Sequence, residues 1–277
     1  MKEQSLRLEK DLIQDPRLWR MALRIDPKYV HVVLFCKVED NSLIYRKLKL
    51  DPSAPSLLKA IEEIIYENPL LLGDFDQVDC IIESQQFTII PSAIDNHDIQ
   101  EKIFIETFPT FDGCVLENKL SGLNATILMG IQEELLNFLR RTFNNPSILH
   151  HLTPLCTYFH RKSHLGNSGK MYAYLHQDRL DLITFGKDSL RLANTFTFHE
   201  PIDAIYYILA CRESLKLNPE SDELLITGDN NLREAVTPIL REYLAYVMPI
   251  IFPSAMLKAG KEALNAPFDL IVLPLCE

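Results

Sequence analysis

The second half of the chain repeats the order of elements that the sequence predicts for the first half. Both halves read as three strands, a helix, a strand, a second helix and a fifth strand. A count of 150 residues forward pairs Ile25 with Leu175, Val30 with Leu180, Val32 with Leu182, Val33 with Ile183 and Phe35 with Phe185. A duplicated three-stranded meander with a crossover helix limits the architecture strongly, because most folds lack such symmetry.

Each meander is predicted from runs of β-branched and aliphatic residues that turn-forming residues separate. The first-half strands are expected at 21–25, 30–37, 43–50 and 78–82, with a helix after Ser53. The second-half strands are expected at 171–176, 180–185, 189–198 and 223–227, with a helix that begins at Pro201. Two last strands are predicted at 246–251 and 270–273.

The repeat divides the chain into an N-terminal extension and two subdomains. The extension covers 1–17, the first subdomain with an inserted hairpin covers 18–165, and the second subdomain covers 166–277. The boundary falls at Gly166-Asn167-Ser168-Gly169, because linker residues concentrate there. The prediction is therefore an α/β fold of two tandem β-β-β-α-β-α-β subdomains.

Composition and charge exclude several classes of function. A net charge of −10 argues against a nucleic-acid partner, because proteins that bind the phosphate backbone present a basic surface. The N-terminus lacks an apolar core of signal-peptide length, and the longest apolar stretch, 243–257, is shorter than the roughly 20 residues of a spanning helix. The six cysteines show no CxxC spacing and lie mostly in apolar runs. We therefore expect a cytoplasmic protein without membrane insertion.

The tandem units resemble the actin-like ATPase fold, a ribonuclease H-like fold that includes actin, Hsp70, sugar kinases and the actin homologues of pilus assembly. A closer resemblance rests on two stretches: Asn194-Thr195-Phe196-Thr197-Phe198 with Asp203, Ile205, Tyr206 and Tyr207 after it, and Phe143-Asn144-Asn145-Pro146 before His150. From about Leu18 to the end, the chain is similar to a Bacteroidetes family of unknown function, DUF3822. That resemblance implies the fold and, because the family has no established activity, no functional residues.

The resemblance to actin-like ATPases also implies where a nucleotide would bind. Those ATPases place an aspartate and glycines in the first hairpin turn of each half, because backbone amides approach the phosphates and a carboxylate holds the metal-bound water. A further glycine-containing turn in the second half contacts adenosine. The corresponding residues of this chain are Asp26, Lys28, Gln177, Asp178, Gly228 and Asp229. Neither hairpin turn contains glycine, and Pro27 has no amide hydrogen.

Two functions follow from these turns. The first is a non-catalytic pseudo-ATPase that needs no cofactor and binds another protein, with a homo-oligomer as a further option. The alternative is a nucleotide-binding ATPase or kinase-like protein with divergent phosphate loops, in which the same six residues bind ATP and Mg²⁺ between the subdomains. The absent glycines favour the first function.

Other groups of residues give weaker signals. Cys156, His160 and His164 are four residues apart and His150-His151 lies near, so a metal site is conceivable, but no known ligand motif is matched and a solvated helix end is favoured. A two-metal nuclease needs several clustered carboxylates, and the meanders offer Asp181 alone at an inward position. We predict neither a metal site nor a catalytic residue.

The aromatic residues of the DUF3822-like stretch are expected in the core. Strand periodicity places Phe196 inward, and the helix after it is expected to turn Ile202, Ile205, Tyr206 and Leu209 inward. Their predicted role is packing, with a partner surface as the competing interpretation.

Overall fold

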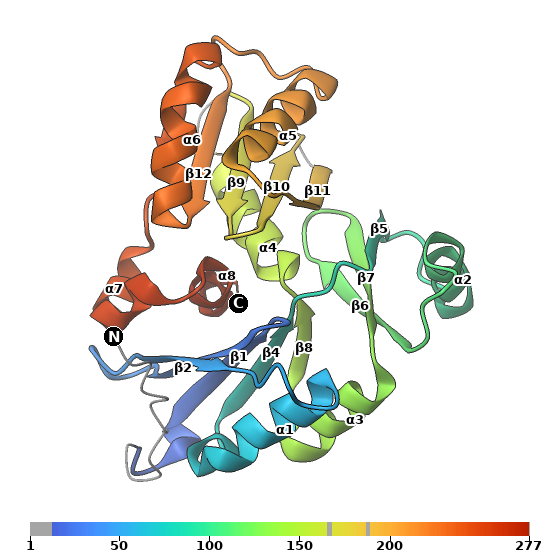
Figure 1. Ribbon diagram of the computed structural model, residues 1–277, viewed down its shortest axis with the longest axis vertical. Coiled ribbons are helices and arrows are strands. Elements are labelled where there is room, and N and C mark those ends of the chain that lie inside the picture. Colours follow the sequence, from blue (N-terminus) through green and yellow to red (C-terminus); the bar gives the residue numbers. More distant parts are fainter. Residues whose placement is uncertain (1–12, 165–167, 187–188, 277) are drawn as a thin grey trace.

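Two five-stranded sheets form the framework of the protein (Figure 1). The computed structural model describes residues 13–164, 168–186 and 189–276. The first sheet contains β1 (Trp19–Ile25), β2 (Tyr29–Cys36), β3 (Ile44–Lys49), β4 (Gln77–Ile82) and β8 (Ser147–His150). The second contains β9 (Lys170–Leu175), β10 (Arg179–Phe185), β11 (Leu190–Thr197), β12 (Glu223–Gly228) and β13 (Val247–Pro249). The strand orders are β3-β2-β1-β4-β8 and β11-β10-β9-β12-β13. When the strands of each sheet are numbered along the chain, both orders read third, second, first, fourth, fifth, which confirms the predicted repeat.

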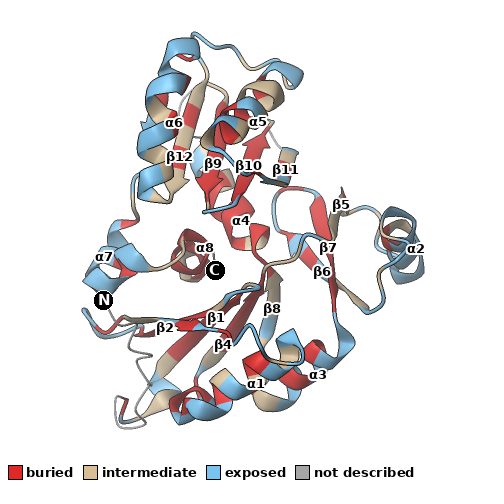
Figure 2. Ribbon diagram, viewed as in Figure 1, coloured by how far each residue is buried: buried red, intermediate tan, exposed pale blue. Residues whose placement is uncertain are grey.

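The two sheets also share their register. In each sheet the first strand is antiparallel to the second and parallel to the fourth. Ile25 lies beside Ile82 in the first sheet, and Leu175 lies beside Gly228 in the second. The central strands are buried on both faces, as their nearly continuous apolar sequences require (Figure 2).

Helices of equivalent position cover one face of each sheet. These are α1 (Leu57–Glu67) and α3 (Glu133–Thr142) in the first half, and α5 (Pro201–Ser214) and α6 (Asn230–Tyr243) in the second. The Ser56 side chain accepts a hydrogen bond from the Lys59 amide at 3.2 Å and so begins α1. Asp229 begins α6 in the same way, with the Leu232 amide at 3.0 Å.

The opposite faces are covered by an exchange of segments between the halves. Helix α4 (Leu152–Ser163), which follows the first sheet, packs through Leu155 and Phe159 on Tyr172 and Ile183 of the second sheet. The segment with α7 (Ser254–Ala259) and α8 (Phe268–Val272), which follows the second sheet, packs on the first. The subdomain boundaries remain a prediction, and Gly166 and Asn167 lie outside the described residues.

An insertion between β4 and α3 forms a third, three-stranded sheet. It consists of β5 (Phe87–Pro91), α2 (His97–Thr107), β6 (Cys114–Leu120) and β7 (Ala125–Ile131), in the sheet order β5-β7-β6. The predicted hairpin around Ser121-Gly122 is therefore present as β6 and β7. Gly122 has a φ of 79°, which suits the glycine of this turn.

Three sequence-based expectations were wrong. The strand predicted at 270–273 is helical: residues 270–272 belong to α8, and Leu273 begins a 3-10 turn (Leu273–Leu275). All residues of α8 are buried, so its continuous apolar run resembles that of a buried strand. Tyr206 is 67% exposed and Ile202 57% exposed, because α5 is apolar around much of its circumference and turns Ala204, Ile205 and Ile208 to the sheet instead. Phe196 is only half-buried and stacks on Tyr207, with ring centroids 4.8 Å apart.

Candidate functional site

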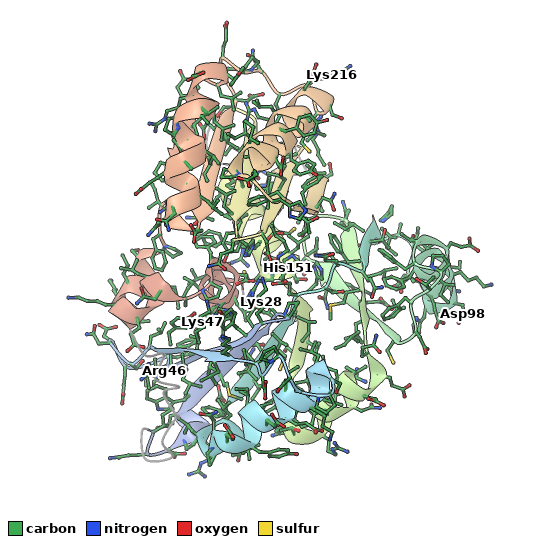
Figure 3. The ribbon with its side chains drawn as sticks, in the orientation of Figure 1. Lys28, Arg46, Lys47, Asp98, His151 and Lys216 are labelled. Atoms are coloured by element: carbon green, nitrogen blue, oxygen red, sulfur yellow. The ribbon has the colours of Figure 1, made fainter. Side chains whose placement is uncertain are left out.

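The first hairpin turns of the two halves face each other at the junction between the sheets. The Lys28 ammonium in the β1–β2 turn lies 3.1 Å from a carboxylate oxygen of Asp178 in the β9–β10 turn, and both side chains are exposed. Figure 3 shows Lys28 close to this junction. Gln177, in the same turn as Asp178, is exposed. The structure therefore brings together Asp26, Lys28 and Asp178 of the six predicted residues.

Asp26 organises the first turn. One carboxylate oxygen accepts hydrogen bonds from the amides of Lys28 and Tyr29, each at 2.8 Å. The other oxygen lies 3.0 Å from the Arg24 guanidinium and 3.1 Å from His31 Nε2. Burial alone would raise the pKa of Asp26, but the hydrogen bonds from His31 and the Lys28 amide, with the charge of Arg24, hold that pKa well below its ordinary value.

The second half holds an equivalent pair with the two side chains exchanged. His176 and Asp181 stand 150 residues after Asp26 and His31, and His176 Nε2 lies 2.8 Å from an Asp181 carboxylate oxygen. Asp181 is fully buried and also accepts a hydrogen bond from the Thr195 hydroxyl at 2.7 Å. Burial would raise the pKa of Asp181, but His151 and His176 lower it well below its ordinary value.

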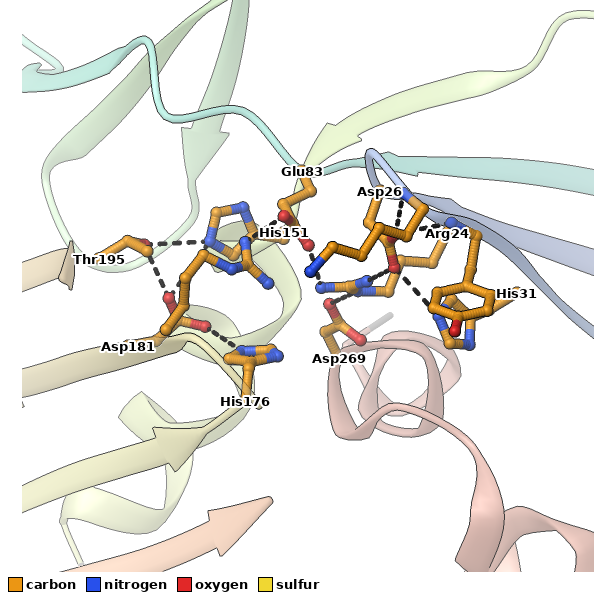
Figure 4. Close-up of polar contacts among 12 residues, drawn as sticks. Arg24, Asp26, His31, Glu83, His151, His176, Asp181, Thr195 and Asp269 are labelled. Atoms are coloured by element: carbon orange, nitrogen blue, oxygen red, sulfur yellow. Dashed lines mark hydrogen bonds and ion pairs between the residues drawn. The ribbon is translucent and has the colours of Figure 1, made fainter. Parts of the chain in front are cut away.

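Buried ion pairs connect the halves between these turns (Figure 4). Arg24, which is 3% exposed, places its Nε atom 2.7 Å from an Asp269 carboxylate oxygen and its Nη2 atom 2.6 Å from one of Glu83. The other oxygen of Glu83 contacts the Arg179 guanidinium of the second half. Burial would lower the pKa of Arg24, but the charges of Asp269 and Glu83 raise it well above its ordinary value. Glu83 therefore joins an arginine from each half.

Gly228 and Asp229 lie at the turn from β12 to α6. Gly228 has a φ of 108°, and a Cβ atom there would stand 2.0 Å from the Leu175 carbonyl oxygen, so the close approach of two strands requires glycine. The Asp229 amide donates to that carbonyl at 2.8 Å, and its side chain caps α6. Strand packing and helix capping account for both residues.

Comparison with known proteins places the chain in a family. The model described as "Protein of unknown function (DUF3822)" matches residues 18–247. The chain belongs to the DUF3822 family. No curated protein matches it.

Solved structures show the fold of this DUF3822 chain. A protein of Bacteroides thetaiotaomicron with an actin-like ATPase fold and unknown function is 27% identical over 95% of this chain and 97% of that chain, with a TM-score of 0.80. A chain of the PilM–PilN type IV pilus biogenesis complex is 15% identical over 94% of this chain and 98% of that chain, with a TM-score of 0.53. The DUF3822 chain therefore has the actin-like ATPase fold, as its sequence predicted.

The junction of the DUF3822 chain offers few free groups to a phosphate. The amides of Lys28 and Tyr29 already donate to Asp26, and the Lys28 ammonium is paired with Asp178. Two cavities, of about 340 and 230 Å³, lie elsewhere, and neither is lined by residues of the hairpin turns. The arrangement holds two halves together by charge; it does not present a cradle of amides.

The histidines considered as metal ligands lie in different surroundings. His160 and His164 at the end of α4 place their Nε2 atoms 3.0 Å apart, while Cys156 is fully buried in the core and burial raises the pKa of its thiol. Within the residues that the structure describes, no group of three or more histidine, cysteine or acidic side chains is arranged to hold a metal ion.

Sequence reasoning missed the partners in the junction. Arg24, Glu83, Arg179 and Asp269 come from four distant segments, and no motif links them. One signal was present: Arg24 interrupts the apolar strand Met21-Ala22-Leu23-Arg24-Ile25, and a charge within a buried strand requires a buried counter-charge. That rule identifies Arg24 but does not name its partners.

Proposed function

We propose that this DUF3822 chain is a non-catalytic protein of the actin-like fold that acts by binding another protein. The first hairpin turn carries the proposal. The amides of Lys28 and Tyr29, which would face the phosphates in an ATPase, are bound to Asp26, and Pro27 supplies none. The amides of the turn thus have their hydrogen-bond acceptor within the protein and need none from a ligand.

The buried charges between the halves also support this function. Arg24 and Arg179 are buried cations that a triphosphate could use, and Glu83 and Asp269 already neutralise them. Removing one partner of a buried ion pair costs about 3–5 kcal/mol, because the other charge is left buried and uncompensated. Phosphates that paired with these arginines would therefore leave Glu83 and Asp269 buried without a counter-charge.

Further observations bear on the partner and the compartment. The related chain in the PilM–PilN complex has this fold and is found in a protein assembly. The cysteines of the described residues are all free, in keeping with the reducing cytoplasm that we propose as the compartment. Among the helices in the described ranges, none has both the length and the apolar composition that crossing a bilayer takes.

A nucleotide titration tests the proposal. Isothermal titration and thermal melting with ATP or ADP and Mg²⁺ should show no binding at millimolar nucleotide. A ligand at 100 times its dissociation constant would stabilise the fold by about 2.7 kcal/mol, which melting detects readily. A rise of several degrees that Asp26→Asn or Lys28→Ala abolishes would establish the nucleotide-binding alternative instead.

A further inference from the structure

The inserted sheet covers the outer edge of the fifth strand in the first half. The Asn118 side chain of β6 donates through Nδ2 to the Ile148 carbonyl at 3.1 Å and accepts through Oδ1 from the His150 amide at 2.6 Å. Cys114 and Leu116 of the same strand pack with Ile148 against the core of the first sheet. Figure 1 shows β6 alongside β8. One strand thus supplies two apolar side chains and an amide to this edge.

The second half has the same edge in β13. Ile148 pairs with Cys80 of β4, and Pro249 pairs with Ile226 of β12. Cys80 pairs with Leu23 of β1, and Ile226 pairs with Ala173 of β9. Leu23 and Ala173 are 150 residues apart and so occupy the same position in the repeat, which makes Cys80 and Ile226 equivalent. Pro249 is therefore the counterpart of Ile148. The duplication thus marks the side of β13 that corresponds to the edge covered by β6.

A hollow of about 340 Å³ lies beside that edge, between α6 and β13. It is lined by Ile226, Asn230, Arg233, Glu234, Thr237, Pro238, Met248 and Pro249. Met248 is 37% exposed and Ile251, just beyond β13, is 88% exposed. The Leu224 amide donates to the Tyr246 carbonyl and the Ile250 amide donates to the Ile226 carbonyl, each at 2.9 Å, so residues 246 and 250 face β12. Since successive residues of a strand alternate, the Pro249 carbonyl points to the outer side of β13. The Arg233 Nε atom is buried without a hydrogen-bond partner. The hollow therefore combines exposed apolar walls with an acceptor and a donor.

We propose that this hollow binds an extended segment of another protein that carries two apolar side chains at alternate positions and an asparagine or glutamine two residues later. The occupant is inferred from what the chain itself places at the equivalent edge, where Cys114, Leu116 and Asn118 have this spacing. The inference rests on the proposed function only in taking the partner to be a protein.

The chemistry of the hollow suits this segment. Alternate side chains of an extended chain point to one face, so the two apolar groups enter between α6 and β13 together. The side-chain amide of the segment's asparagine or glutamine donates to the Pro249 carbonyl, as the Asn118 side chain donates to the Ile148 carbonyl. Pro249 itself offers no N–H, so β13 cannot extend its ladder to a full added strand and the side chains must supply the specificity.

A peptide taken from β6 tests the proposal. The probe is a fluorescein-labelled peptide with the sequence of residues 112–121 and the change Cys114→Val, titrated into the full chain by fluorescence anisotropy. We expect saturable binding with a dissociation constant below about 1 mM. The protein variant Thr237→Phe fills the hollow and should weaken binding at least about tenfold, whereas Ala235→Phe, on an exposed position of α6 outside the hollow, should leave it within about twofold. A peptide with Leu116→Asp should not bind.

Each other result overturns the inference. Absence of saturable binding to the parent chain, or equal binding to the Thr237→Phe variant, removes the hollow as the site. Sedimentation equilibrium of the protein alone tests for a second copy: a dimer that Thr237→Phe dissociates would show that the occupant is the same chain. ATP binding in the nucleotide titration would overturn the proposed function without changing the outcome of the peptide experiment, so the two failures are distinguishable.

Discussion

The substitution Arg24→Met tests whether the buried ion pairs hold the two halves together. Methionine keeps much of the apolar length of arginine and removes the charge. The change leaves Asp269, which is fully buried, and Glu83, whose side chain is 8% exposed, with one cation fewer. Removing one partner of a buried pair costs about 3–5 kcal/mol, a large share of the roughly 5–15 kcal/mol by which a domain is stable.

Urea denaturation of the parent and the variant at neutral pH measures this loss. Lys28→Met removes the exposed pair with Asp178 and is the control, with an expected loss below about 1 kcal/mol. The Arg24→Met deficit should shrink as the pH falls, because a protonated carboxyl group no longer needs a counter-charge. A loss of less than about 1 kcal/mol for Arg24→Met would refute the view that these charges are buried and mutually dependent.

Three further tests, each by substitution, address individual features. Burial holds the pKa of His150 well below its ordinary 6.5, so its neutral form contributes stability that is present above about pH 6.5 and lost below it. His150→Gln should reduce this loss of stability. Urea denaturation of the parent and the variant at pH 7.5 and pH 5.5 measures the difference. Gly228→Ala should destabilise by more than about 2 kcal/mol, against about 1 kcal/mol for Gly122→Ala, where the nearest atom is 3.6 Å from the added Cβ; equal urea midpoints would contradict this difference. Phe196→Ala should cost about 1–2 kcal/mol and Tyr206→Ala less than about 0.5 kcal/mol in the same assay, so an equal loss would mean that Tyr206 is packed.

The apolar pattern of the sequence made the sheets predictable, but it did not determine which side chains of the helices face the core. Strands buried on both faces are continuous apolar runs, so the meanders could be read from residues such as Val30 and Leu180. The apolar residues of α5 surround much of the helix, and no periodicity could tell that Tyr206 faces solvent. The run at 270–273 is equally apolar as a strand or as a buried helix, and only its contacts decide.

The part of the candidate site formed by residues close together in the sequence was predictable. Asp26 and Lys28 belong to one turn, and the duplication led directly from that turn to Asp178. Glu83 and Asp269 meet Arg24 through the tertiary fold, 59 and 245 residues away along the chain. Such partners follow from topology, which a single sequence does not determine.

The exchange of covering segments has a consequence for biosynthesis. The face of the first sheet that carries Ala22 and Val33 is covered by Met256, Leu270 and Ile271, which the ribosome adds long after the strands that they cover. Until those residues emerge, the N-terminal half presents an uncovered apolar sheet to the cell. We therefore expect nascent chains that stop before residue 254 to be bound by chaperones, and the two halves to become stable together only after α7 and α8 have emerged.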